Sequence, residues 1–183
     1  IFRHKIDGIF HLAATMTADA EKDFDAGISF NLFGFYDLLE ACRSQGGVRL
    51  VFSSSNAAFG GELPDIVPDE IQQRPRSSYG VQKVIAELLL DDYTRRGFLD
   101  GRGLRLPTVL LRPATSGRTL SSLMSAVVCE PLAGRKVTCP FPPETRIPVA
   151  SPGAVARALV RVFEMPSQAI GPVRTMNITA LTV

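Results

Sequence analysis

The sequence predicts an α/β protein in which helices cover both faces of a parallel sheet. Two observations predict this fold. Short apolar runs alternate along the chain with amphipathic helical stretches, which is the rhythm of parallel strands joined by crossover helices. The 183 residues are also 45% hydrophobic, which is enough apolar material for one sizeable core, or for one core and part of another.

The first strand and helix are expected between residues 7 and 47. The run Asp7-Gly-Ile-Phe-His-Leu-Ala-Ala14 predicts a short buried strand that ends near Ala13 and Ala14. From Asn31 to about Ser44, apolar residues recur at three- and four-residue spacing, which predicts an amphipathic helix. These apolar residues are Leu32, Phe35, Leu38, Leu39 and Cys42. Asn31 is a candidate N-cap, and Gly46-Gly47 is expected to end the helix.

A second strand, a long loop and a second helix follow. Val48 to Ser53 predicts a buried strand, and the Gly- and Pro-rich stretch after it, as far as Pro75, is the longest loop and therefore a candidate active-site element. From Ser78 to about Arg96 a helix is expected, with Ser77 or Ser78 as N-cap and Gly97 or Gly101 at its end. Its predicted apolar face consists of Val81, Val84, Ile85, Leu88 and Leu89.

The last third of the chain differs in composition. A third strand is expected from Leu104 to Leu111, with Pro107 placing it at a strand start or in an irregular pairing. After Arg112-Pro113 come a Ser/Thr-rich helix-like stretch and a Pro cluster from Cys139 to Pro143. Ser151-Pro152 then opens a helix that runs to about Glu164. We place a domain boundary near residue 115.

Charge and cysteine content exclude several classes of function. The formal charge is +2 and no block of like charge occurs, so we expect no nucleic-acid partner. No apolar run reaches the length of a membrane span, and no signal peptide is recognisable, so we expect no membrane partner. Three cysteines without paired spacing predict neither a disulfide framework nor a metal site, and they fit a reducing, cytoplasmic location.

Tyr79 and Lys83 are the first candidate for chemistry. Their four-residue spacing near a helix start puts the phenol and the ammonium on one helix face, an arrangement that suits proton abstraction. A tyrosine pKa of about 10 would have to fall to about 7, which requires about 4 kcal/mol of preferential phenolate stabilisation. A lysine cation and the positive end of a helix both act in that direction. The alternative is a helix-surface tyrosine beside a solvated lysine.

Three consecutive serines, Ser53-Ser54-Ser55, are the second candidate. They follow a predicted buried strand, so their hydroxyls should lie at the carboxyl edge of the sheet, where one of them could polarise a substrate oxygen. The alternative is a serine-rich turn that satisfies its own backbone. His11 lies within a predicted strand and is expected to be a core histidine.

Five segments together resemble the extended short-chain dehydrogenases, the group that includes NAD-dependent epimerases and dehydratases. The segments are residues 7–14, Asn31-Leu-Phe-Gly34, Val51-Phe-Ser-Ser-Ser55 with Phe59-Gly60, Tyr79-Gly-Val-Gln-Lys83 and Leu111-Arg-Pro113, in the family's order and spacing. The resemblance implies a Rossmann-type doubly wound sheet, truncated at both ends. It also implies an NAD-binding domain at residues 1–115 and, at residues 116–183, part of a substrate-binding region with returning Rossmann elements.

The resemblance also implies roles for individual residues. Tyr79 corresponds to the proton acceptor, Lys83 to its partner on the nicotinamide ribose, and Ser55 to the serine that orients the substrate oxygen. The other residues that correspond to the cofactor-binding set are Leu12, Ala13, Ala14, Asn31, Ser53, Arg112 and Pro113. The family's glycine-rich phosphate loop, and the residue that selects NAD over NADP, have no counterpart in this sequence, so we expect NAD without excluding NADP.

Within that family the sequence resembles the D-erythronate dehydrogenases, which oxidise a sugar-acid hydroxyl with NAD. The similarity rests on residues 21–27, 92–101, 104–108, 130–134 and 174–177. It implies a small-molecule sugar-acid substrate, and Arg146 is a candidate to hold its carboxylate unless it is an ordinary surface arginine. Residues 17–19 and 114–117 depart from the subfamily pattern.

Two other functions remain open. An NAD-dependent sugar-nucleotide epimerase or dehydratase would use the same tyrosine, lysine and serine. A non-catalytic NAD(P)-binding protein is the third reading, because a fold does not fix a function. A second copy of the chain is a further possible partner, which would give a homodimer.

Overall fold

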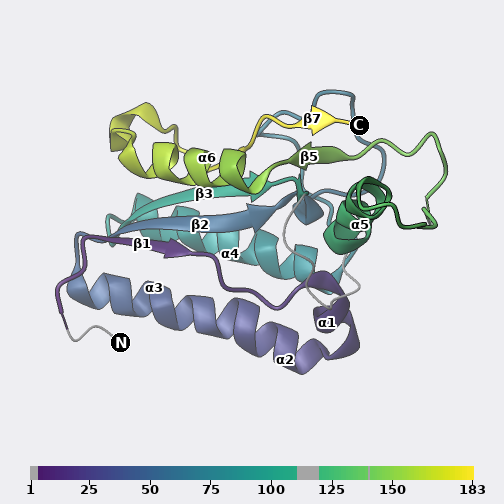
Figure 1. Cartoon of the computed structure of the whole chain (residues 1–183). Helices are drawn as coiled ribbons and strands as arrows, with labels where there is room; N and C mark the ends of the chain where they lie inside the picture. The colour runs from purple at the N-terminus through teal and green to yellow at the C-terminus, as the bar shows by residue number, and fades with distance from the viewer. Residues whose placement is uncertain (1–3, 111–119, 140) are drawn as a thin grey trace.

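The computed structural model describes residues 4–110, 120–139 and 141–183, and its central feature is a parallel sheet (Figure 1). Four strands lie in the order β1-β2-β3-β6, and each neighbouring pair is parallel. Their bounds are β1 Gly8–His11, β2 Arg49–Ser55, β3 Asp100–Leu106 and β6 Thr175–Asn177. The expected α/β class with a parallel sheet is confirmed.

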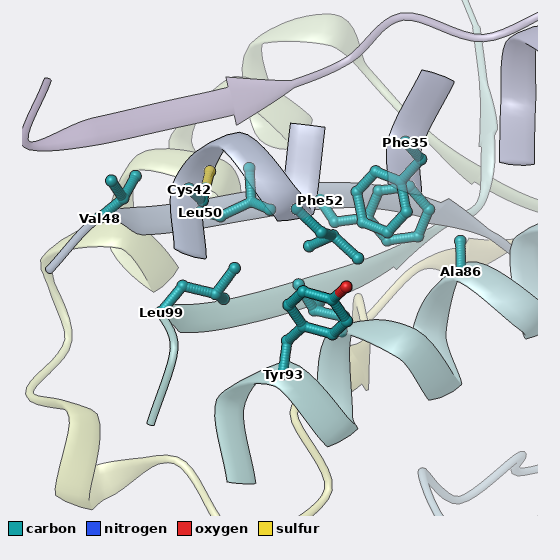
Figure 2. Packing of buried hydrophobic residues seen from close by; sticks show 10 residues of the cluster. Phe35, Cys42, Val48, Leu50, Phe52, Ala86, Tyr93 and Leu99 are labelled. Carbon is teal, nitrogen blue, oxygen red and sulfur yellow. The ribbon is translucent and has the colours of Figure 1, made fainter. Parts of the chain in front are cut away.

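Helices cover both faces of this sheet. α3 (Gly34–Gln45) and α4 (Ser78–Arg95) lie on one face, and α6 (Pro152–Glu164) lies on the other (Figure 1). β2 contributes to both cores because its side chains alternate in direction. Leu50 and Phe52 belong to the core with α3 and α4, whereas Val51 belongs to the core with α6. Figure 2 shows the first core, which includes Phe35, Cys42, Ala86, Tyr93 and Leu99.

A second, smaller sheet and several short helices complete the described structure. β4 (Thr108–Val109) pairs in parallel with β5 (Pro148–Ala150), and β5 pairs in antiparallel with β7 (Leu181–Thr182). The remaining helical segments are α1 Thr17–Lys22, α2 Phe24–Ile28, the π-helical η1 Ser29–Phe33, the 3₁₀ turns η2 Asn56–Ala58 and η3 Ser167–Ala169, and α5 Leu120–Leu132. The predicted domain boundary near residue 115 lies outside the described residues.

The N-terminal elements differ from the prediction in two ways. β1 ends at His11 instead of near Ala14, and it is not fully buried, since Phe10 is 42% exposed. β1 is an edge strand of the described sheet, and it pairs only with β2. Asn31 is not an N-cap. The chain is already helical before it, because α2 continues through η1 into α3.

The buried face of α4 also differs from the prediction. Val81 and Leu88, which were expected to be buried, are 43% and 62% exposed. The buried face carries polar side chains instead, including Gln82, Lys83 and Glu87. Apolar periodicity misses such a face, because burying a polar group is tolerated only where it finds hydrogen-bond partners.

The third strand begins earlier than predicted. β3 starts at Asp100 instead of Leu104 and ends at Leu106, and Pro107 separates it from β4 in the second sheet. Gly97, with φ of 73°, ends the preceding helix, and Gly101 lies within the strand. The predicted end at Leu111 lies outside the described residues.

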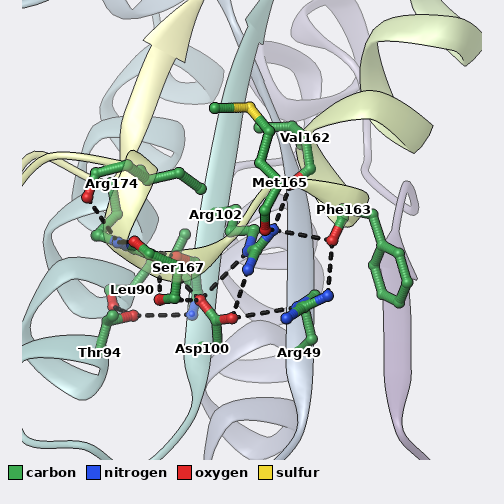
Figure 3. Close-up of polar contacts among 12 residues, drawn as sticks. Arg49, Leu90, Thr94, Asp100, Arg102, Val162, Phe163, Met165, Ser167 and Arg174 are labelled. Atoms are coloured by element: carbon green, nitrogen blue, oxygen red, sulfur yellow. Dashed lines mark hydrogen bonds and ion pairs between the residues drawn. The ribbon is translucent and has the colours of Figure 1, made fainter.

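Asp100 holds the amino end of the sheet to the end of α6 (Figure 3). Its carboxylate forms ion pairs with Arg49, Arg102 and Arg174 at 3.1, 2.6 and 2.7 Å. The buried Arg102 guanidinium also donates to the backbone carbonyls of Val162, Phe163 and Met165. It thereby provides partners for carbonyls that the end of a helix leaves without intrahelical donors.

A buried ion pair joins α4 to β3. The Arg105 guanidinium lies 2.9 Å from the Glu87 carboxylate, and each side chain is 4% exposed. Glu87 also accepts hydrogen bonds from Ser54 on β2 and from Gln73 in the long loop, and Arg105 donates to the backbone oxygen of Asp69. This network fixes a helix, two strands and the loop relative to one another.

We expect Arg105→Met to lower the free energy of unfolding by about 3–5 kcal/mol, because it leaves the Glu87 carboxylate buried without its cation. The double variant Arg105→Met with Glu87→Leu should recover much of this loss, because neither charge of the pair remains to be buried without the other. Urea denaturation measures both. The exposed pair Arg95 and Asp92 on the same helix is the control, and Arg95→Met should leave stability nearly unchanged. A double variant as unstable as the single one would contradict this account.

Candidate active site

The candidate active site is a cavity of about 680 Å³ at the carboxyl ends of the main strands. Its lining combines residues that follow β1, the end of β2, the start of α4 and the junction between β3 and β4. The polar side chains of this lining include Ser53, Ser55, Tyr79 and Lys83. This is the edge at which open parallel sheets bind their ligands.

The start of α4 is held close to the turn that follows β2. Ser77 caps the helix, and its hydroxyl accepts a hydrogen bond of 3.1 Å from the amide of Gly80. A Cβ atom at Gly80 would lie 2.2 Å from the backbone oxygen of Ala57, so only glycine permits this approach. The close contact brings Tyr79, the residue before Gly80, to the end of β2.

The three serines have three different partners. Ser53 donates to the backbone oxygen of His11 at 3.1 Å, and Ser54 donates to the Glu87 carboxylate. Ser55 caps the following 3₁₀ turn by accepting from the amide of Ala57, and it lines the same cavity as Tyr79, where its hydroxyl favours the phenolate. Ser55 is therefore the serine positioned for chemistry beside Tyr79.

Lys83 lies below the phenol in a buried, partly aromatic environment. Its Nζ atom donates to the backbone oxygen of Ser53 at 2.7 Å and lies 4.5 Å from the centre of the Phe52 ring and 5.5 Å from that of Tyr79. Burial lowers the pKa of Lys83 to about 8, and the nearby Glu87 opposes this shift. Lys83 thus remains mainly cationic at neutral pH.

The expectation that Lys83 lowers the pKa of Tyr79 is not met by the protein groups alone. Burial raises the pKa of the Tyr79 phenol, and the Ser55 hydroxyl only partly opposes the effect. Desolvation disfavours the phenolate here, which the spacing of the two residues in the sequence does not reveal. Additional positive charge near the phenol would be needed for Tyr79 to act as a base at neutral pH.

The residues in this cavity fit the nicotinamide end of a dinucleotide. Among the described residues, the buried Lys83 ammonium has one hydrogen-bond acceptor, the oxygen of Ser53, and its other hydrogens are available for ribose hydroxyls. Leu12 and Ala14 supply apolar wall, and Ser55 and Tyr79 supply hydroxyls. A bound nicotinamide would supply a hydride acceptor and, in its oxidised form, the missing positive charge.

The remaining predicted residues lie in different places. Ala13 is exposed beside the cavity wall, and Asn31 is buried behind it, hydrogen-bonded to Thr15. Arg112 and Pro113 lie outside the described residues. Arg146 lines a second cavity, of about 800 Å³, which shares Asn56 and Pro107 with the first. Arg146 is exposed and lies 3.7 Å from Asp65.

Three residues of the site were missed by the sequence analysis. Gly80 permits the close approach of α4 to Ala57, Glu87 accepts a hydrogen bond from Ser54, and Gln82 is hydrogen-bonded to Asn31. Glycine after the tyrosine was a visible signal for the first. The four-residue steps from Tyr79 to Lys83 and from Lys83 to Glu87 were a signal for the second, since they continue one helix face.

A parallel sheet with a tyrosine and a lysine at its carboxyl edge is typical of the Rossmann-type short-chain dehydrogenases. The sequence matches the NAD dependent epimerase/dehydratase family over residues 1–178, and the chain belongs to this family. The resemblance found in the sequence is thereby confirmed.

Curated relatives and a solved structure narrow the comparison. The whole chain is 46% identical to D-erythronate dehydrogenase from Cupriavidus necator and 39% identical to D-erythronate dehydrogenase from Haemophilus influenzae. It covers 58% of the length of each of these relatives. The crystal structure of the nucleoside-diphosphate-sugar epimerase from Agrobacterium tumefaciens superposes on 96% of this chain and 53% of that one, with a TM-score of 0.91 and 42% identity.

The described part of the chain has neither a membrane-spanning helix nor a cluster of metal-ligating side chains. None of its helices combines the length and apolar character that a membrane crossing requires. No group of three or more His, Cys, Asp or Glu side chains among the described residues is arranged to hold a metal ion.

His11 gives the site a pH-dependent stability. Its ring packs against Phe35 and Phe52, and burial, with a contribution from the charge of Lys83, lowers its pKa from 6.5 to about 4. Between these pH values the unfolded chain binds a proton that the folded protein does not, so stability must fall as the pH falls. The full shift corresponds to about 3 kcal/mol. Because the ring is partly exposed, we expect a loss of about 1–2 kcal/mol after solvent screening.

Urea denaturation at pH 7 and pH 4.5 measures this loss, and His11→Phe is the matched variant. Phenylalanine keeps an aromatic ring against Phe35 and Phe52 but cannot bind a proton. Its stability should fall less than that of the wild type over the same pH interval. Equal losses in the two proteins would show that His11 does not cause the effect.

Proposed function

We propose that this protein catalyses the NAD-dependent oxidation of a secondary hydroxyl on a small sugar acid resembling D-erythronate, giving the corresponding oxo acid. One observation carries the proposal: Tyr79, Ser55 and Lys83 line a single cavity at the carboxyl ends of the strands. The similarity to two D-erythronate dehydrogenases over the whole chain supports this substrate class.

Each side chain has a distinct role in the proposed reaction. The Tyr79 phenolate accepts the proton of the substrate hydroxyl. A bound nicotinamide would supply the acceptor for the hydride that leaves the carbon of that group, so that the C–O bond becomes a carbonyl. Ser55 donates a hydrogen bond to the substrate oxygen and orients it. Lys83 binds the ribose hydroxyls and places positive charge near the phenol.

The proposal extends to the cofactor and to the substrate carboxylate. We propose NAD as the cofactor, as in the subfamily that the sequence resembles, and NADP stays an alternative. Arg146 is proposed to bind the carboxylate from the second cavity, which adjoins the first at Asn56 and Pro107. We also propose a cytoplasmic location and a homodimer. Sedimentation analysis would test the homodimer.

A sugar-nucleotide epimerase or dehydratase is the second candidate. The similarity to a solved nucleoside-diphosphate-sugar epimerase favours it, and the same three side chains would serve it. Net cofactor turnover separates the two functions, because an epimerase regenerates its oxidised cofactor in every cycle. An assay of NADH formation with D-erythronate, other tetronates and longer aldonates therefore tests the proposal. Epimerisation of a sugar nucleotide without release of NADH would overturn it.

Tyr79→Phe tests the assignment of the base. The substitution removes only the phenolic oxygen, so we expect kcat to fall by about a hundredfold to ten-thousandfold while the affinity for NAD stays nearly constant. Steady-state kinetics and calorimetric titration with NAD measure the two quantities. Lys83→Met should reduce both kcat and the affinity, because its ammonium serves both the phenol and the ribose.

Tyr93→Phe is the matched control for the loss of a phenol. Tyr93 lies on the same helix, but its hydroxyl bonds to Glu40 and is not part of the cavity. Its kcat should remain within about twofold of the wild type. If Tyr79→Phe kept more than about a tenth of the wild-type kcat, another group would be the base, or the protein would be a non-catalytic NAD(P)-binding protein.

A further inference from the structure

A chain of hydrogen bonds connects α4 to the cavity wall that follows β1. Asn31 contacts both backbone groups of Thr15: its Oδ1 accepts from the Thr15 amide at 2.7 Å, and its Nδ2 donates to the Thr15 oxygen at 2.9 Å. The same Nδ2 donates to Oε1 of Gln82 at 2.7 Å. Leu12, Ala14, Met16 and Thr17, on either side of Thr15, line the cavity.

The orientation of the Asn31 and Gln82 side-chain amides follows from the backbone of Thr15. The Thr15 amide can only donate, so Asn31 must present its oxygen there. The two Nδ2 hydrogens are then directed to the Thr15 oxygen and to Gln82. Gln82 must consequently present its own oxygen, because its NH₂ group would meet another donor.

This arrangement leaves a buried donor without a partner. Gln82 is 1% exposed, and its Nε2 atom has no hydrogen-bond partner among the described residues. Nε2 packs instead against α2, where a Cβ atom at Gly27 would lie 3.1 Å from it. An unpaired buried donor is destabilising. An apolar side chain at position 82 would avoid this cost, so the glutamine is better explained by what its oxygen does.

We propose that Gln82 is a positioning residue: by accepting the second Nδ2 hydrogen of Asn31, it fixes the Asn31 amide and thereby the cavity wall at residues 12–17. Gln82 directly precedes Lys83 on α4, so the wall is set relative to the Tyr79–Lys83 pair. This inference rests on the proposed function only in taking the cavity as the site for the nicotinamide end of a dinucleotide. It does not depend on which substrate is oxidised.

Gln82→Met tests the proposal, because methionine matches the length of glutamine and cannot accept from Asn31. We expect hydrogen exchange at the Thr15 amide to become at least about tenfold faster, with exchange at Val51 in β2 unchanged. The dissociation constant for NADH, measured by fluorescence titration, should rise at least about fivefold. Neither measurement requires turnover, so a failure of the proposed oxidation would be seen separately, in the assay of NADH formation.

Gln82→Glu is the conservative variant: at a position that is 1% exposed its carboxyl group should be buried in the neutral form, whose carbonyl oxygen still accepts from Asn31. Exchange at Thr15 and the affinity for NADH should stay within about twofold of the wild type. The proposal is overturned if Gln82→Met leaves Thr15 exchange unchanged, or if Val51 exchange accelerates by the same factor, which would show a general loss of stability. It is equally overturned if Gln82→Glu behaves like Gln82→Met.

Discussion

The buried ion pair between Glu87 and Arg105 is the constraint on which the arrangement of this structure depends. Two opposite charges at 4% exposure must remain together, since separating them would leave each without compensation in a medium that solvates charge poorly. The pair sets how far α4 slides along β3. Lys83 lies one helical turn before Glu87 and Tyr79 one turn before Lys83, so the same constraint sets the height of the proposed catalytic groups above the sheet.

The sequence predicts the fold better than it predicts which surfaces are buried. β2, α4 and α6 were placed from apolar runs, capping serines and glycine at the end of a helix, signals that act locally. The start of β3 was missed because Asp100-Gly-Arg-Gly has the composition of a turn. Only the folded chain brings Asp100 its three arginines and brings Thr175 against Gly103. Partners distant in sequence decide such segments.

The candidate site shows the same division. Tyr79, Lys83 and Ser55 were identifiable because a helix repeat and a strand end fix where they lie. The direction of the shift in the Tyr79 pKa could not be predicted from the sequence, because the shift depends on how much water the surrounding structure removes from the phenol. Gln82 was missed for a related reason: its oxygen is set by an amide orientation that begins at Thr15, far away in the sequence.

The π-helical turn η1 changes which side of the continuous helical segment from α2 to α3 faces the rest of the protein. A π-turn is equivalent to an α-helix with one inserted residue, which rotates everything after it by about 100° relative to everything before it. Asn31 within the turn faces α4, and Phe35 beyond it faces the sheet. Deleting one residue from Ser29–Phe33 would let only one of these contacts form. In evolutionary terms, the exposed positions Phe30 and Phe33 should accept substitutions far more readily than the segment accepts changes in length.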